Sequence, residues 1–205
     1  MRSTHSDSGV WNRVNEGGSA VFDFLRRRLF GRPAGSGRSE QARPGVQLLA
    51  SVLVCFPEIE AVSYDPRQEL LTMDFVVRDA LPLAEIEAFA ALLAESIATY
   101  HALEGSVASA LDFSYEKHEG LTMLHLARRM DELSERELSL IAQLLTDRFG
   151  EKLLVDQHGA DVLDAEFRTI QHETLERMLM AVRELPLRDR LVGIRERDQV
   201  VVYNR

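Results

Sequence analysis

The sequence contains almost no cysteine. Of its 205 residues only Cys55 is one, so an intrachain disulfide and a thiolate cluster for zinc or iron–sulfur are both excluded. Cys55 lies in an apolar stretch, where we expect a buried and inert thiol. The cysteine content therefore favours a reducing, cytoplasmic location.

Long apolar runs are also missing. The longest, Leu48–Phe56, is interrupted by Ser51 and stops at Pro57, far short of the roughly 20 residues that cross a bilayer. We therefore expect no transmembrane segment. The three arginines at 26–28 superficially suggest a twin-arginine export signal, but "GRPAGSGRSEQ" follows where an apolar region should stand, and that interpretation fails.

Recognisable catalytic and phosphate-binding motifs are absent as well. The sequence has no G-x-G-x-x-G and no G-x-x-x-x-G-K-[ST], the usual glycine-rich loops that hold phosphates, and no G-x-S-x-G elbow for a nucleophilic serine. Nucleotide chemistry of the common kinds and serine hydrolysis are therefore disfavoured. We predict no cofactor and no catalytic residue.

Positive charge is scarce in most of the chain. The net charge is −9, but residues 1–44 carry eight Arg against four Asp or Glu, which leaves −13 on residues 45–205. An acidic body disfavours nonspecific binding of nucleic acid, because phosphates are repelled. We predict two parts: a flexible basic arm at 1–44 and a single domain at 45–205.

One segment of the arm has the pattern of an amphipathic helix. Residues 1–18 and 31–44 are polar and rich in Gly and Ser, whereas "SAVFDFLRRRLFGR" between them begins at a capping Ser19 and ends at Gly31. Such a helix, near 19–30, can contact an anionic membrane or RNA, or dock on its own acidic body or on a second copy. The predicted contact residues are Phe22, Phe24, Leu25, Arg26, Arg27, Arg28, Leu29 and Phe30.

The body alternates between helical and strand patterns. Helices are expected where apolar residues recur every three to four positions, and strands where they alternate. Residues 45–56 favour a helix, with a strand as the alternative. The other predicted helices cover 83–103, 134–149 and 164–185, and the predicted strands cover 59–64, 69–77, 107–115, 121–127, 191–194 and 200–203.

Two of the predicted hairpins contain nearly the same short sequence. "SYDPRQELLTM" at 63–73 returns as "SYEKHEGLTM" at 114–123, and each is preceded by a helix. An α-β-β unit used about three times predicts an α+β fold: one six-stranded antiparallel sheet of three hairpins, covered by helices mainly on one face. Whether the match reflects duplication or convergence on hairpin chemistry stays open.

The helix at 134–149 has the best-specified ends. Ser134 and Glu137 form a capping box, in which the serine accepts from the amide of Glu137 and the glutamate reaches back to the amide of Ser134. Leu133 and Leu138 occupy the positions of a hydrophobic staple, and Gly150 stops the helix.

Three histidines are candidates for chemistry. His125 takes the place that Phe75 has in the first unit, so it is either a ligand-facing group in a pocket between helices and sheet or a packed core histidine. His172 and Glu176 share a helical face, and His158 and Asp161 lie upstream, so these four are candidate metal ligands. The segment reads "HETLE", which lacks the second histidine of a zinc-protease helix.

The resulting functional hypothesis is a noncatalytic cytoplasmic protein-interaction or regulatory module. Its body would bind a protein partner or a second copy, and its basic arm would make a second contact. The alternative is a small-ligand-binding or metal-dependent enzyme domain with a pocket between helices and sheet. An enclosed cavity at His125 would favour the alternative, and a filled interior would favour the module.

Overall fold

The computed structural model describes residues 11–13, 44–156, 165–196 and 199–204. The predicted arm helix near 19–30 lies outside the described residues. So do two of the candidate metal ligands, His158 and Asp161.

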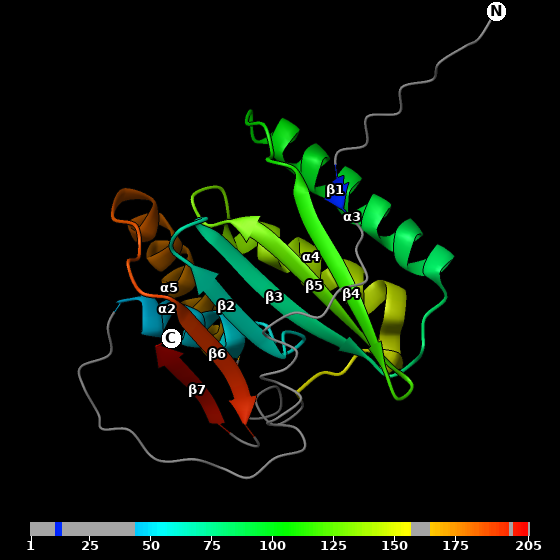
Figure 1. Ribbon diagram of the computed structural model, residues 1–205. Helices are drawn as coiled ribbons and strands as arrows, with labels where there is room; N and C mark the ends of the chain where they lie inside the picture. Colours follow the sequence, from blue (N-terminus) through cyan, green and yellow to red (C-terminus); the bar gives the residue numbers. More distant parts are fainter. Residues whose placement is uncertain (1–10, 14–43, 157–164, 197–198, 205) are drawn as a thin grey trace, which may run out of the picture.

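The described residues form one sheet with helices against it (Figure 1). Its six antiparallel strands confirm the predicted α+β fold, and they pair as three hairpins. These strands are β2 (Ala61–Asp65), β3 (Leu70–Val77), β4 (Leu111–His118), β5 (Leu121–Arg129), β6 (Leu191–Glu196) and β7 (Gln199–Asn204). The short strand β1 (Trp11–Arg13) adds a parallel edge beside β4.

The order of strands across the sheet is β1-β4-β5-β3-β2-β6-β7. The first hairpin therefore lies in the middle, because β3 pairs with β5 and β2 pairs with β6. Each hairpin follows a helix, as the repeated α-β-β order predicts.

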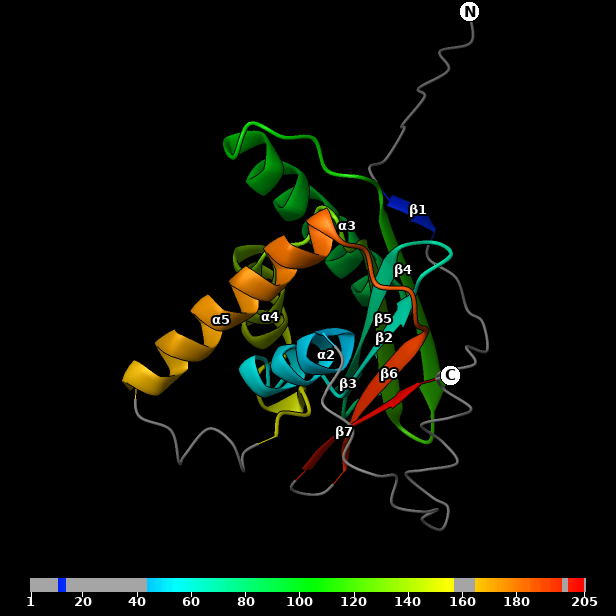
Figure 2. The same ribbon diagram turned by 90° about the vertical axis from the view of Figure 1, so that its left-hand side faces the viewer.

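In the described part of the chain, four long helices pack on one face of the sheet (Figure 2). They are α2 (Pro44–Cys55), α3 (Leu83–Leu103), α4 (Glu135–Phe149) and α5 (Ala165–Glu184), with the short 3₁₀ turn η1 (Gly150–Lys152) after α4. The segment for which a strand was the alternative is the helix α2.

The second hairpin differs slightly from its predicted bounds. Its turn is the two residues Glu119 and Gly120, which have positive φ of 47° and 83°, as a tight hairpin turn requires. Strand β4 begins at Leu111 rather than Val107, because the preceding segment is held by side chains: the amide of Ser109 donates to Glu132 Oε2 at 2.9 Å.

The main core lies between the helices and the sheet. Side chains that point to this face from the central strands, such as Phe75 and Phe113, pack with Leu53 of α2 and Phe89 of α3. A smaller apolar cluster, Ala61, Val76, Met123, Val192 and Ile194, lies on the opposite face. Both faces of the central strands are therefore buried, which explains why these strands are apolar nearly throughout.

Packing of α2 on the sheet can be tested with two adjacent residues. Leu53 is fully buried, whereas Val54 is 44% exposed. Replacing Leu53 with Ala should lower the free energy of unfolding by about 2 to 5 kcal/mol through lost burial and a cavity. Replacing Val54 with Ala should change it by less than about 0.5 kcal/mol. Urea unfolding of both variants is the measurement, and equal losses would contradict this packing.

Candidate functional site

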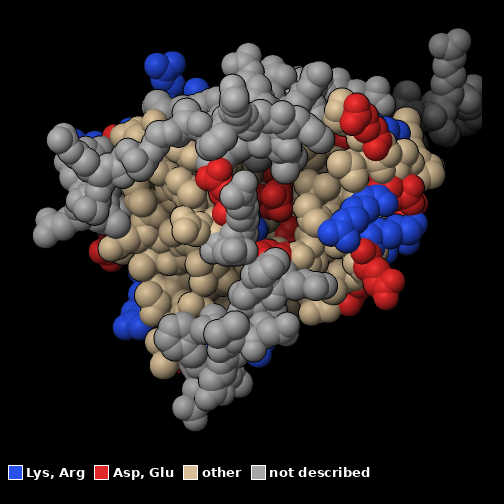
Figure 3. Space-filling view, turned by 90° about the horizontal axis from the view of Figure 1, so that it is seen from below, with Lys and Arg blue, Asp and Glu red and all other residues tan. Residues whose placement is uncertain are grey.

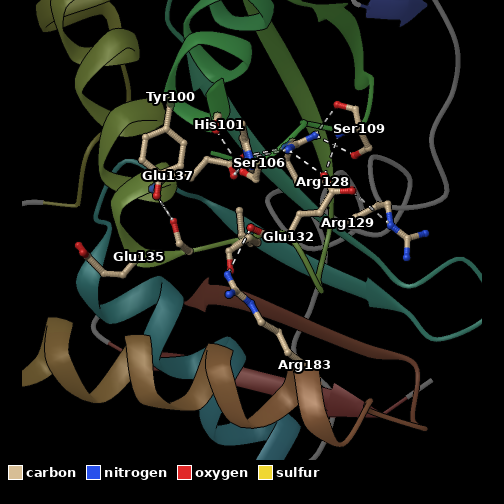
Figure 4. Close-up of polar contacts among 12 residues, drawn as sticks. Tyr100, His101, Ser106, Ser109, Arg128, Arg129, Glu132, Glu135, Glu137 and Arg183 are labelled. Carbon is tan, nitrogen blue, oxygen red and sulfur yellow. Dashed lines mark hydrogen bonds and ion pairs between the residues drawn. The ribbon is translucent and has the colours of Figure 1, made fainter. Parts of the chain in front are cut away.

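A buried ion pair joins β5 to α4. Arg128 and Glu137 are 1% and 0% exposed, and Arg128 Nε donates to Glu137 Oε1 at 2.6 Å. Arg128 Nη1 also donates to the carbonyl and hydroxyl oxygens of Ser109, at 3.0 and 3.1 Å. Because buried charges are tolerated only when paired and hydrogen-bonded, Arg128 fixes β5, α4 and the segment before β4 in one arrangement (Figure 4).

His101 connects the same carboxylate to α3. Its Nε2 lies 2.9 Å from Glu137 Oε2, and since a carboxylate only accepts, Nε2 carries the hydrogen in this contact. Its Nδ1 lies 2.9 Å from the hydroxyl of Ser106, just beyond the end of α3. Side chains of three elements, α3, β5 and α4, thus meet at Glu137.

This arrangement corrects half of the predicted capping box. Ser134 does cap α4, since its hydroxyl accepts from the Glu137 amide at 3.1 Å, and Leu133 and Leu138 are buried. The Glu137 carboxylate, however, is engaged by Arg128 and His101. A buried guanidinium is a stronger partner for a carboxylate than a helix-end amide that water can reach.

An open groove of about 640 Å³ lies beside this network. Its walls are the end of α3 with the loop that follows, the loop from β5 to α4, and one side of α5. On α5, Arg183 Nη2 donates to the carbonyls of Glu132 and Leu133, at 3.3 and 3.0 Å, and so holds the helix to the β5–α4 loop (Figure 4). We call this feature the acidic groove.

Negative charge dominates the lining of the acidic groove. Two guanidinium groups, of Arg136 and Arg183, stand among a larger number of carboxylates. A hydrogen bond from Arg129 lowers the pKa of Asp131 below its ordinary value, which keeps that carboxylate charged. Apolar surface is also present, since Val107 is 91% and Met180 52% exposed. The lining carboxylates are Glu104, Asp131, Glu132, Glu135 and Glu176.

His125 lies on the face of the sheet away from the helices. Its cross-strand neighbours are Asp74 and Ser114, and its Nδ1 lies 2.7 Å from Asp74 Oδ1. Both residues are buried, while His125 Nε2 and Asp74 Oδ2 have no hydrogen-bond partner. The histidine therefore packs within the sheet, and it is not among the residues that line the acidic groove.

Two of the predicted metal candidates meet at the start of α4. His172 Nδ1 lies 2.7 Å from Glu135 Oε1, and Glu176 Oε2 accepts from the amide of Glu135 at 2.8 Å. Both side chains thus attach α5 to α4. Within the described ranges, no group of three or more His, Cys, Asp and Glu side chains is arranged to hold a metal ion.

A second charged cluster joins α2 to β6. Arg195 donates to the carbonyls of Leu53 and Phe56 near the end of α2 and to Asp156 Oδ2 at 2.8 Å. Burial raises the pKa of the neighbouring Glu60. Viewed from below, the described residues have several acidic side chains close together near the centre of this face (Figure 3). The Arg195 contacts satisfy helix-end carbonyls, which is a structural role.

The thiol of Cys55 is only partly buried, packed against the core rather than within it as the sequence predicted. Burial, with a smaller contribution from the charge of Glu135, raises its pKa to about 11. At neutral pH the thiolate, which is the reactive form, is therefore scarce.

Comparison with known proteins returns no similarity. No protein-family model, no curated protein and no solved structure matches this chain. None of the helices in the described part of the chain has the length and apolar character to cross a membrane.

Sequence reasoning missed the Arg128–Glu137–His101 network. A signal was present: His101 lies one helical turn after the core residue Ile97, and Arg128 continues the apolar strand that ends the second hairpin. Charged residues at core positions indicate buried partners, but which partners they meet depends on how α3, β5 and α4 pack.

The buried pair predicts a non-additive mutant cycle. Replacing Arg128 or Glu137 alone with Met should lower the free energy of unfolding by about 3 to 5 kcal/mol, because the remaining charge loses its main partner. Replacing both should cost less than the sum of the two single changes. Urea unfolding of all four proteins measures this, and additive losses would show that the two charges do not interact.

The His125–Asp74 pair predicts a dependence of stability on pH. Burial, the largest effect, lowers the pKa of His125, but the hydrogen bond and charge of Asp74, with the charge of Glu116, raise it overall. A folded-state pKa above the unfolded one stabilises the fold at low pH, and this stabilisation disappears as pH rises through the folded pKa.

The expected observation is a stability difference between wild type and a His125→Gln variant that shrinks as pH rises from about 6 to about 9. An Asp74→Asn variant should lose the same pH-dependent contribution, because it removes the charge that favours the imidazolium. Urea unfolding at several pH values is the measurement. A difference that stays constant or grows with pH would refute the assignment.

Proposed function

We propose that this chain is a noncatalytic cytoplasmic module that binds a protein partner through the acidic groove. The partner's contact is a basic segment with some apolar side chains. The observation that carries the proposal is the groove itself: it is open, its carboxylates outnumber its guanidinium groups, and two apolar side chains are exposed in it.

The chemistry of the groove fits a peptide better than a reaction. Carboxylates on a groove attract and orient cationic side chains, and exposed Val107 and Met180 supply apolar contact. Thioether side chains such as Met180 adapt to varied apolar partners. A groove that holds an extended or helical segment uses this combination of apolar contacts and flanking charge.

The histidines that suggested an enzyme make polar contacts with other side chains of the fold. His125 contacts Asp74, and His172 contacts Glu135. Each contact joins two structural elements, so each histidine has a structural role that needs no ligand. This supports the module over the ligand-binding or metal-dependent alternative.

Self-association and contacts of the basic arm belong to the same proposal. Each copy of the chain carries the basic arm. The acidic groove of one copy can therefore bind the arm of a second copy in the same way as it binds a basic segment of another protein. Binding of the arm to anionic membrane or RNA remains a further contact of such a module, supported by the arginines at 26–28.

The groove can be tested with the full chain and labelled probe peptides. The probe is a 12-residue peptide of Leu, Ala and Arg at helical spacing, and its control has Glu in place of Arg. Fluorescence anisotropy at about 0.15 M salt, where the Debye length is about 8 Å, should show tighter binding of the basic peptide. Equal binding of both peptides would refute charge-directed recognition.

A matched pair of variants localises the binding. Glu104 lines the groove at the end of α3, whereas Glu87 is exposed near the start of the same helix. Glu104→Lys should weaken binding of the basic peptide by about three- to tenfold, and Glu87→Lys, with the same change in net charge, should have a much smaller effect. Equal weakening would place the contact elsewhere.

A further inference from the structure

We infer that residues 19–32 of the same chain occupy the acidic groove and compete there with an external partner. The inference deepens the proposed function and rests on it for the preference of the groove for basic segments. Its subject is regulation: the chain carries its own competitor for its binding site.

The first support is complementary charge. The segment "SAVFDFLRRRLFGR" holds Arg26, Arg27, Arg28 and Arg32 and a single acidic residue, Asp23. No other stretch of the chain has three consecutive basic residues. The groove offers the opposite charge on five carboxylates, and opposite potentials across an interface fix both orientation and choice of partner.

The second support is apolar complementarity. At helical spacing, Phe24 and Leu25 of the segment share a face with Val21. The groove exposes Met180 and Val107, whose apolar surface lies among the carboxylates. A helix of about 12 residues is about 18 Å long, so one side of it can present apolar contacts and arginines together.

The third support is where the described chain attaches the segment. On the C-terminal side, α2 begins at Pro44, and a Cβ added to Gly45 would lie 3.2 Å from Leu187, four residues beyond Arg183 of the groove wall. The eleven residues 33–43 reach up to about 37 Å when extended. This attachment therefore begins close to the groove.

The N-terminal attachment lies at the edge of the sheet. Strand β1 ends at Arg13 and pairs with Leu111 and Asp112 of β4, shortly after Ser109, which Arg128 and Glu132 hold. The five residues 14–18 reach up to about 17 Å. Since both ends of the segment are joined to the described chain by short connections, the segment competes at an effective concentration of about millimolar, without a separate encounter.

The test uses two full-chain variants with the same net charge. The first reverses the segment, Arg26→Glu, Arg27→Glu and Arg28→Glu. The second reverses three arginines of the arm outside the segment, Arg2→Glu, Arg38→Glu and Arg43→Glu. Displacement of the segment should raise the affinity of the first variant for the basic probe peptide by about tenfold or more, and the second variant should stay near wild type.

A direct measurement separates this inference from the proposed function. Hydrogen–deuterium exchange of the amides at 104–109 and 131–136 should be faster in the first variant than in wild type and unchanged in the second. Suppose that exchange is faster in the first variant but the probe peptide does not bind. This result would support docking of residues 19–32 in the groove and refute binding of an external basic partner there. Probe binding that is equal in all three proteins, with equal exchange, would overturn the inference and leave the proposed function standing.

Discussion

The arrangement of the helices depends on one buried carboxylate. Glu137 is completely enclosed, and it receives Arg128 from β5 and His101 from α3. Apolar contacts alone would tolerate small shifts of these elements, because they have no direction. The hydrogen bonds of a buried guanidinium do have direction. They therefore fix the positions of α3, β5 and α4 relative to one another. This arrangement in turn places the end of α3 and the β5–α4 loop, which are two walls of the acidic groove.

The fold and the binding surface therefore use charged side chains in two different ways. Charges inside the network face one another and are shielded from water, whereas the carboxylates at the groove are partly open to solvent, as Glu104 is. The first kind of charge sets geometry, and the second is free to exchange an internal partner for an external one. The exposed contact between Glu104 and Arg136, 3.5 Å long, is of the weak kind that a competing cation replaces.

The fold was largely predictable because its signals are local. Alternation along 70–77, the turn at Glu119 and Gly120, and the cap at Ser134 each act within a few residues. The buried network beside the groove was not predictable, because Arg128 and His101 are 27 residues apart and meet only through packing. Glu137 is an example. The capping-box rule predicted that its carboxylate accepts from the amide of Ser134, but in the fold it accepts from Arg128.

The position of the first hairpin at the centre of the sheet has a consequence for how the chain assembles. During synthesis β2 and β3 emerge early, yet each has one edge that is filled only later, by β6 and β5 respectively. Ala61 pairs with Ile194, which lies 133 positions further along the chain. Contacts between residues so far apart in sequence form slowly. Until the last hairpin forms, β2 offers an unpaired edge, and such an edge is a site at which partly folded chains can pair with one another and aggregate.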